Sequence, residues 1–241
     1  DSQGEVEDLV NQAQAEVYKV ASQSSREDYV GLSESLEAAI HEIEVAQNRG
    51  GEMTGISTGF TDLDSYTHGL HPGQLVIVAA RPAVGKSTFA LDVARNAAVK
   101  QNKATIFFSL EMGRAEIAMR MLSAESSIYL QSMRKGTISE GDWTKLAAVR
   151  GKINDAPLYI DDSPNMSLVE IRAKCRRLAQ QVDLKMVVID YIQLMSSGKK
   201  VESRQQEVSE FSRALKLLAK ELGIPVVALS QLNRQAEQAK D

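Results

Sequence analysis

Short hydrophobic runs alternate with longer helical patterns from about Gln74 onward, and this alternation constrains the fold more than any other feature of the chain. The hydrophobic runs cover residues 75–78, 105–108, 158–160, 186–189 and 225–229, and the helical patterns cover 86–101, 113–125, 139–153, 167–181 and 204–222. Apolar strands joined by helices form parallel sheets with helices on both faces. The sequence therefore predicts an α/β fold with a mainly parallel central sheet, in which ligands bind at the carboxyl ends of the strands.

A phosphate-binding pattern follows the first of these strands. Residues 80–88 match the P-loop pattern G-x-x-x-x-G-K-[ST] at Gly85, Lys86 and Ser87, with Ala80 in place of the first glycine. Ala80 fits provided that its backbone avoids positive φ. We predict that Lys86 meets the β- and γ-phosphates of a bound nucleotide and that Ser87 binds Mg²⁺, against the alternative of an ordinary strand–helix turn. The remaining predicted nucleotide-binding residues of the loop are Arg81, Pro82, Ala83, Val84, Gly85 and Thr88.

Polar residues also end three of the later strands. Glu111 follows the second strand, and one strand over from a P-loop it could polarise the water that attacks the γ-phosphate; the alternative is an acid favoured by the dipole of the next helix. Asp190 ends the fourth strand after an apolar run, as a Walker B aspartate does, and is predicted to orient Mg²⁺. Gln231 ends the fifth strand, where it either senses the γ-phosphate or is a locally satisfied turn amide.

A basic loop over residues 196–204 contains Lys199, Lys200 and Arg204. It is either a solvated loop or a contact to DNA phosphates that is driven by counterion release. Residues 1–50 carry a net charge of −8 and the remaining residues carry +4. The part of the chain after residue 50 is therefore mildly basic, although the whole chain has a net charge of −4. A polyanionic partner is therefore permitted.

The front segment shows two helical patterns before a break at Gly50-Gly51. Apolar residues recur at helical spacing at Leu9, Val10, Ala13, Val17 and Val20, and again at Leu32, Leu36, Ile40 and Ile43. Either both helices pack on their own domain, or the first one docks on a neighbouring subunit.

Other features exclude several classes of protein. The single cysteine, Cys175, is typical of a reducing compartment, and we interpret it as structural. No apolar run is long enough for a membrane span and no signal peptide is seen, so we predict a soluble, cytoplasmic protein. The histidines have no metal-ligand spacing. Trp143 is interpreted as a packing residue, and Asp161-Asp162 as solvated.

Taken together, the motifs are similar to those of bacterial replicative DNA helicases of the DnaB type. The stretches that carry the resemblance are residues 80–88, Ser-Leu-Glu-Met (109–112), Val-Val-Ile-Asp-Tyr-Ile-Gln-Leu-Met (187–195) and Ser-Gln-Leu-Asn-Arg (230–234), in that order. Thr-Gly-Phe-Thr-Asp-Leu-Asp (58–64) followed by Gly-Leu-His-Pro-Gly (69–73) also resembles the start of that family's motor domain. The resemblance covers about residues 55–234.

The resemblance implies a RecA-like ATPase that forms a homohexameric ring on single-stranded DNA and unwinds duplex DNA 5′→3′. It implies that Glu111 is the catalytic base, that Arg120 contacts the nucleotide and that Gln231 couples hydrolysis to movement. Residues near 5–22 resemble the linker helix that docks on the adjacent motor. The family also implies a primase and a helicase loader as partners.

We expect residues 1–50 to form the helical linker segment and residues 51–241 the motor domain, which is incomplete at its C-terminal end compared with the family. We expect the family's primase-binding domain to be absent here. Two other functions remain open from the residues alone. One is a RecA-type recombinase or remodelling ATPase, and the other is an assembly module gated by nucleotide that does not translocate.

Overall fold

The computed structural model describes residues 31–48, 53–164, 166–195 and 204–232. The chain divides into two compact units, residues 1–52 and residues 53–241. In the first unit, α2 (Leu32–Asn48) is helical as predicted, and the side chains of Leu32, Leu36, Ile40 and Ile43 are exposed. The proposed docking helix at 5–22, the break at Gly50-Gly51, and Lys199 and Lys200 lie outside the described residues.

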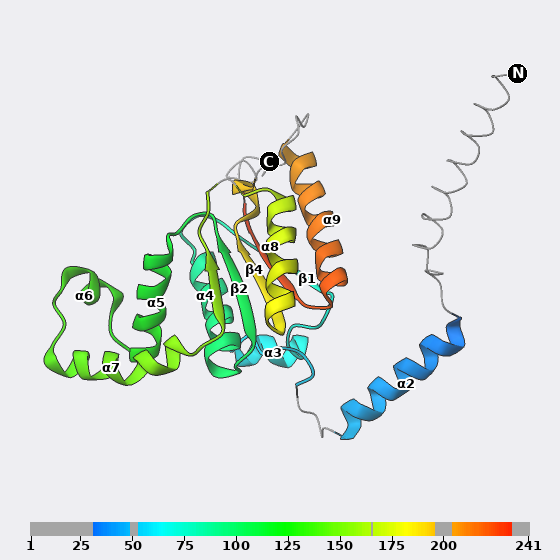
Figure 1. Cartoon of the computed structure of the whole chain (residues 1–241), viewed down its shortest axis with the longest axis horizontal. Helices are drawn as coiled ribbons and strands as arrows, with labels where there is room; N and C mark the ends of the chain where they lie inside the picture. Colours follow the sequence, from blue (N-terminus) through cyan, green and yellow to red (C-terminus); the bar gives the residue numbers. More distant parts are fainter. Residues whose placement is uncertain (1–30, 49–52, 165, 196–203, 233–241) are drawn as a thin grey trace, which may run out of the picture. The chain divides into compact units, whose positions relative to one another are not determined.

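The second unit contains a five-stranded parallel sheet (Figure 1). Its strands are β1 (Leu75–Ala80), β2 (Ala104–Ser109), β3 (Leu158–Asp161), β4 (Leu184–Asp190) and β5 (Val226–Gln231). The spatial order is β1-β5-β4-β2-β3, and every pairing in it is parallel. The predicted fold class is confirmed, and β4 lies in the middle of the sheet, between β5 and β2.

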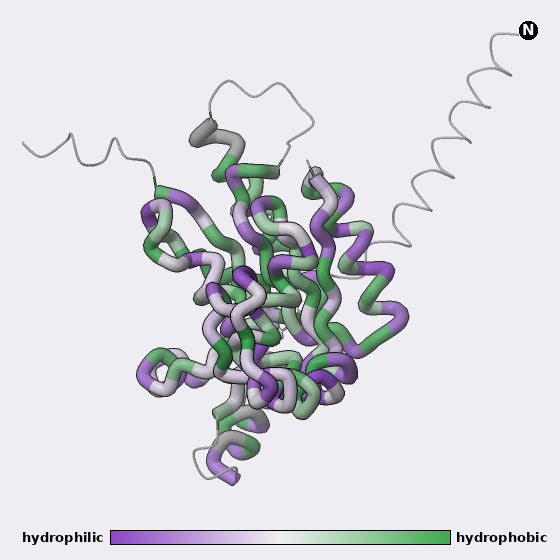
Figure 2. The backbone as a smooth tube through the Cα atoms, turned by 90° about the vertical axis from the view of Figure 1, so that its left-hand side faces the viewer, coloured by the Kyte–Doolittle hydropathy of each residue, from purple (hydrophilic) through white to green (hydrophobic). Residues whose placement is uncertain are grey.

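Helices connect these strands, and their bounds follow the predicted patterns closely. The longer ones are α4 (Lys86–Arg95), which continues as a π-helical turn η1 (Asn96–Lys100), α5 (Arg114–Ser126), α7 (Glu140–Asn154), α8 (Leu168–Gln181) and α9 (Arg204–Leu222). Short elements that the sequence analysis did not predict are α3 (Thr61–Thr67), α6 (Leu130–Lys135) and the 3-10 turn η2 (Ile192–Leu194). Figure 2 shows hydrophobic and hydrophilic segments alternating along the helices, as expected for elements that cover a core on one side.

The sheet has a hydrophobic core on each face. Phe107 and Phe108 are adjacent on β2 and both fully buried, yet they belong to different cores because successive side chains of a strand point to opposite faces. Phe107 packs with residues of α4 and α5, and Phe108 packs with residues of α8 and α9. Replacing either phenylalanine with alanine would cost about 3–5 kcal/mol of stability. Cys175 is buried in the second of these cores, as its structural interpretation requires.

The start of the second unit is organised by Asp64, within the stretch 58–64 that carried part of the family resemblance. Its carboxylate accepts hydrogen bonds from Ser57 Oγ at 2.7 Å, from Thr58 N at 2.8 Å and Oγ1 at 2.7 Å, and from Gly59 N at 3.2 Å. Burial would raise the pKa of this carboxyl, but the hydrogen bonds outweigh that effect and lower it. Asp64 is therefore a charged anchor that fixes the turn ahead of α3.

Two predictions about individual side chains are wrong. Trp143 lies on α7 with 62% of its surface exposed, so it does not pack into the core. Asp161 and Asp162 are not merely solvated, because each is bound by a basic side chain, as described below.

Candidate nucleotide-binding site

The P-loop connects β1 to α4 with an unusual backbone. Gly85 is the residue before the helix and has φ +103°, a conformation that favours glycine, and a β-carbon placed there would meet no other atom within 4 Å. Ala83 has φ +63°. Ala80 ends β1 without a positive φ, so the alanine in place of the first glycine causes no backbone strain. The loop therefore leaves open space at the N-terminus of α4, where phosphates bind.

Lys86, the first residue of α4, joins two acids at the carboxyl ends of other strands. Its Nζ donates hydrogen bonds to Glu111 Oε2 at 2.9 Å and to Asp190 Oδ1 at 3.0 Å. The same Nζ lies 3.8 Å from the centre of the Tyr191 ring, which adds a cation–π contact. Burial would lower the pKa of Lys86, but these two hydrogen bonds and the two negative charges outweigh it, so the pKa is raised and the ammonium stays charged.

The position of Glu111 in the sheet differs from the prediction. Glu111 is not one strand over from the P-loop, because β5 and β4 lie between β1 and β2. The two residues still meet because the Lys86 side chain extends from α4 over the strand ends. Leu110 N donates to Asp190 O at 2.7 Å, which holds the segment before Glu111 against the end of β4.

Asp190 is the buried acid of this cluster and has unused bonding capacity. Its side chain is 0% exposed, and Oδ2 has no hydrogen-bond partner among the described residues. A buried carboxylate oxygen without a partner is costly unless a ligand binds it. Mg²⁺ fits this oxygen, since it is held through one or two protein oxygens plus phosphates and waters. Within the described part of the chain no group of three His, Cys, Asp or Glu residues could hold a metal. That Asp190 and Ser87 bind Mg²⁺ stays a prediction.

A cavity of about 630 Å³ lies beside this cluster. Its lining contains most of the predicted site residues: Pro82, Ala83, Gly85, Lys86, Ser87, Thr88, Glu111, Arg120 and Gln231, together with Met112, Glu116 and Tyr191. Arg81 and Val84 of the predicted loop are exposed and are not part of this lining. The volume is in the range of ordinary small-molecule sites.

Sequence reasoning missed several residues that shape this cavity. Tyr191 directly follows Asp190 and carries the cation–π contact with Lys86. Gln193 Nε2 donates to Gln231 O at 3.1 Å, and Gln231 N donates to Gln193 Oε1 at 3.1 Å, so the loop after β4 holds the end of β5. Glu116 binds Arg120 with two hydrogen bonds. The place of Tyr191 immediately after the predicted Walker B acid was a signal that could have been used.

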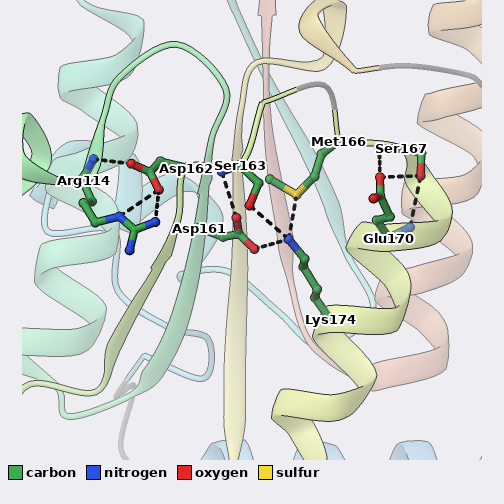
Figure 3. A network of polar contacts seen from close by, with 8 residues as sticks. All are labelled: Arg114, Asp161, Asp162, Ser163, Met166, Ser167, Glu170 and Lys174. Carbon is green, nitrogen blue, oxygen red and sulfur yellow. Dashed lines mark hydrogen bonds and ion pairs between the residues drawn. The ribbon is translucent and has the colours of Figure 1, made fainter.

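A second network supports the turn that carries Glu111 (Figure 3). Asp162, just after β3, accepts hydrogen bonds from the backbone N of Arg114 at 2.9 Å and from its guanidinium at 2.9 and 2.5 Å. Lys174 on α8 donates to Asp161 at 2.5 Å. Hydrogen bonds from Arg114 lower the pKa of Asp162 to about 2. Arg114 begins α5 three residues after Glu111, so Asp162 anchors one side of that turn.

Arg204 begins α9, but the structure does not describe its side chain. Lys199 and Lys200 are not among the described residues. The DNA contact predicted for these three residues stays a prediction. No described helix is long and apolar enough to cross a membrane.

A parallel sheet that presents a P-loop after β1, an acid with a free buried oxygen after β4 and a second acid after β2 defines a RecA-like P-loop ATPase fold. Residues 55–241 match the model of the family described as DnaB-like helicase C terminal domain, and the chain belongs to this family.

Relatives and solved structures agree with that assignment. The chain is 70% identical over 240 residues to the replicative DNA helicase DnaB of Leifsonia xyli subsp. xyli, and 48% identical over 238 residues to the replicative DNA helicase DnaC of Bacillus subtilis. These matches cover 100% and 98% of this chain and 52% of each relative, so the chain spans about half the length of these relatives.

Two solved structures have the same fold. One is an ATPase domain, which superposes with a TM-score of 0.80 at 37% identity, over 89% of this chain and 75% of that one. The other is a DnaB-like replicative helicase, described with its interactions with primase, which gives a TM-score of 0.78 at 33% identity, over 100% of this chain and 58% of that one. A recombinase or a non-translocating assembly module is not favoured by these relatives.

Proposed function

We propose that this chain is the ATP-hydrolysing motor part of a replicative DNA helicase. The observation that carries the proposal is the cluster of Lys86, Glu111 and Asp190 beside the P-loop cavity, with Asp190 Oδ2 buried and unpaired among the described residues. These are the cation, the base and the metal-binding acid that in-line attack of water on a γ-phosphate needs.

In this proposal each residue has one task. Lys86 leaves the two carboxylates and pairs with the β- and γ-phosphates, while backbone N–H groups of the loop bind the same phosphates. Glu111, whose side chain is 50% exposed, then has a free carboxylate that accepts a proton from the attacking water. Ser87 and Asp190 would hold Mg²⁺, which would supply positive charge that neutralises the phosphates. Arg120 contacts the nucleotide and Gln231 responds to the γ-phosphate.

The whole protein's activity is proposed from the relatives. We propose that it works as a homohexameric ring in the cytoplasm, translocates on single-stranded DNA and unwinds duplex 5′→3′. Lys199, Lys200 and Arg204 would contact DNA phosphates, and a primase and a helicase loader would be partners. Residues 1–50 would be the helical linker segment, with a docking helix near 5–22, and residues 51–241 the motor domain. The division of the chain at Glu52 supports these bounds.

ATP turnover with and without single-stranded DNA tests the proposal, measured beside the oligomeric state by light scattering. We expect DNA to stimulate turnover of a hexamer and Lys86→Ala to abolish it. The matched control is Lys145→Ala, an exposed lysine on α7. If Lys86→Ala still hydrolyses ATP, the proposed site is wrong. If Lys86→Ala abolishes hydrolysis but DNA does not stimulate the unaltered chain, the chain is an ATPase and the proposed DNA motor is wrong.

A further inference from the structure

Two arginines from different helices share one carboxylate oxygen beside the cavity. Glu116 Oε1 accepts hydrogen bonds from Arg120 Nε at 3.0 Å and Nη2 at 2.7 Å, and from Arg134 Nη2 at 2.8 Å. Glu116 and Arg120 lie one turn apart on α5, but Arg134 belongs to α6, which Figure 1 shows beyond α5 as seen from the sheet. The shared oxygen therefore links α6 to a side chain of the cavity wall.

Arg120 lies where the direction of its guanidinium affects what the cavity can bind. It lines the 630 Å³ cavity and also a smaller hollow of about 180 Å³, which is lined in addition by Thr88 and by Leu130, the first residue of α6. The Arg120 side chain is only 27% exposed. Two of its nitrogens are occupied by Glu116, while a guanidinium has five N–H donors, so donors remain for a ligand. The direction of these donors depends on where Glu116 holds the group.

The charge balance gives Arg134 a further effect. Hydrogen bonds from Arg120 above all lower the pKa of Glu116, and the nearby charge of Arg134 adds to this, so Glu116 is an anion at neutral pH. An uncompensated carboxylate beside a triphosphate would repel it. With both guanidiniums in place, the three side chains carry a net charge of +1. Without Arg134 the net charge of the remaining two side chains is zero, and Arg120 is the only one of the two arginines that still binds Glu116.

We propose that Arg134 is a positioning residue for nucleotide binding, because it shares Glu116 with Arg120 and so sets how Arg120 is presented to the cavity. Arg134 does not line the cavity and acts only through Glu116. The inference rests on the proposed nucleotide site. It makes α6, an element without any of the P-loop ATPase motifs, part of the control of nucleotide affinity.

Binding of a fluorescent ADP analogue to the full chain in the presence of Mg²⁺ tests this. We expect Arg134→Gln to weaken binding about threefold to tenfold, the size of a typical coupling between neighbouring groups. Arg134→Lys should recover most of the affinity, since an ammonium can still donate to Glu116. Lys135→Gln is the matched control, because it removes the same charge from the next, exposed residue of α6 and should stay within about twofold of the unaltered chain.

The decisive comparison is made in a Glu116→Gln background, where Arg134→Gln should have no further effect on binding, because Arg134 acts only through the Glu116 carboxylate. The same loss with and without the Glu116 carboxylate, an equal loss with Lys135→Gln, or no recovery with Arg134→Lys would each overturn the inference. If the unaltered chain binds ADP, Lys86→Ala does not, and Arg134→Gln binds as the unaltered chain does, then only this inference fails. If the unaltered chain binds no ADP, the proposed function fails with it.

Discussion

Two clusters, each made of acidic and basic side chains, lie at the carboxyl edge of the same sheet. They differ in burial and in whether every carboxylate oxygen accepts a hydrogen bond. In the cluster around Lys86, Asp190 is fully buried and one of its two oxygens has no partner among the described residues. In the network after β3, Asp161 and Asp162 are partly exposed, and both oxygens of each accept hydrogen bonds.

This difference separates the proposed site of chemistry from a structural support. Burying a charge costs free energy that only a complete set of partners offsets, so the unused Asp190 oxygen is a position that a ligand would satisfy. In the partly exposed network every carboxylate oxygen already accepts at least one hydrogen bond. Exposed ion pairs contribute little to stability, and the value of this one lies in holding Arg114, and with it the turn that carries Glu111.

The largest effect is expected from Asp190→Asn. Loss of the buried carboxylate removes the acid proposed to hold Mg²⁺, and we expect ATP hydrolysis to fall at least about 100-fold. Single-turnover hydrolysis measures this. Asp183→Asn is the control, because Asp183 is an 81% exposed acid just before the other end of β4. If Asp190→Asn hydrolysed ATP within about tenfold of the unaltered chain, the unpaired Asp190 oxygen would have no role in catalysis.

Glu111→Gln should be next in size. A general base contributes about 10²–10⁴ to the rate, so we expect kcat to fall by that factor while nucleotide affinity is retained. Steady-state kinetics together with ADP titration measure both quantities, and Glu140→Gln on α7 is the control. If affinity were lost instead and kcat were unchanged, Glu111 would be an acid that stabilises the N-terminal end of α5.

Asp162→Asn tests the supporting network and should have a smaller effect. With Arg114 held less firmly, we expect kcat to fall about twofold to tenfold with KM unchanged, since the turn that carries Glu111 is less well placed. Asp142→Asn is the matched control, because Asp142 caps α7 in a similar way without a link to Glu111. An equal change in both variants would mean that the network does not act on the site.

The smallest effect is a dependence on pH. The pKa of Asp162 is lowered from 3.8 to about 2, so its contribution to stability is complete above pH 3.8 and is lost as the pH falls through about 2. The difference in Tm between the unaltered chain and Asp162→Asn should therefore stay constant from neutral pH to about pH 5 and shrink in stronger acid. Thermal unfolding followed by circular dichroism measures it. A difference that shrinks between pH 7 and 5 would contradict the assignment to Asp162.

Much of the fold could be predicted because the signals are local. The apolar runs marked β1 to β5, and the helical patterns marked α4, α5, α7, α8 and α9. The short helices α3 and α6, of seven and six residues, were missed because two turns or fewer carry no readable periodicity. Without α6, the contact of Arg134 with Glu116 could not have been anticipated.

The sequence by itself determined which residues stand at the strand ends, namely the P-loop, Glu111, Asp190 and Gln231, because strand and turn chemistry act within a few residues. Only the tertiary structure decided that β5 and β4 lie between β1 and β2 and that the Tyr191 ring lies over Lys86. It also decided that Asp161 and Asp162 form ion pairs with basic side chains and that Trp143 is exposed. The physical reason is that strand order and burial arise from packing between segments far apart in the chain. Burial, in turn, sets how strongly charges interact, and it exists only in the folded state.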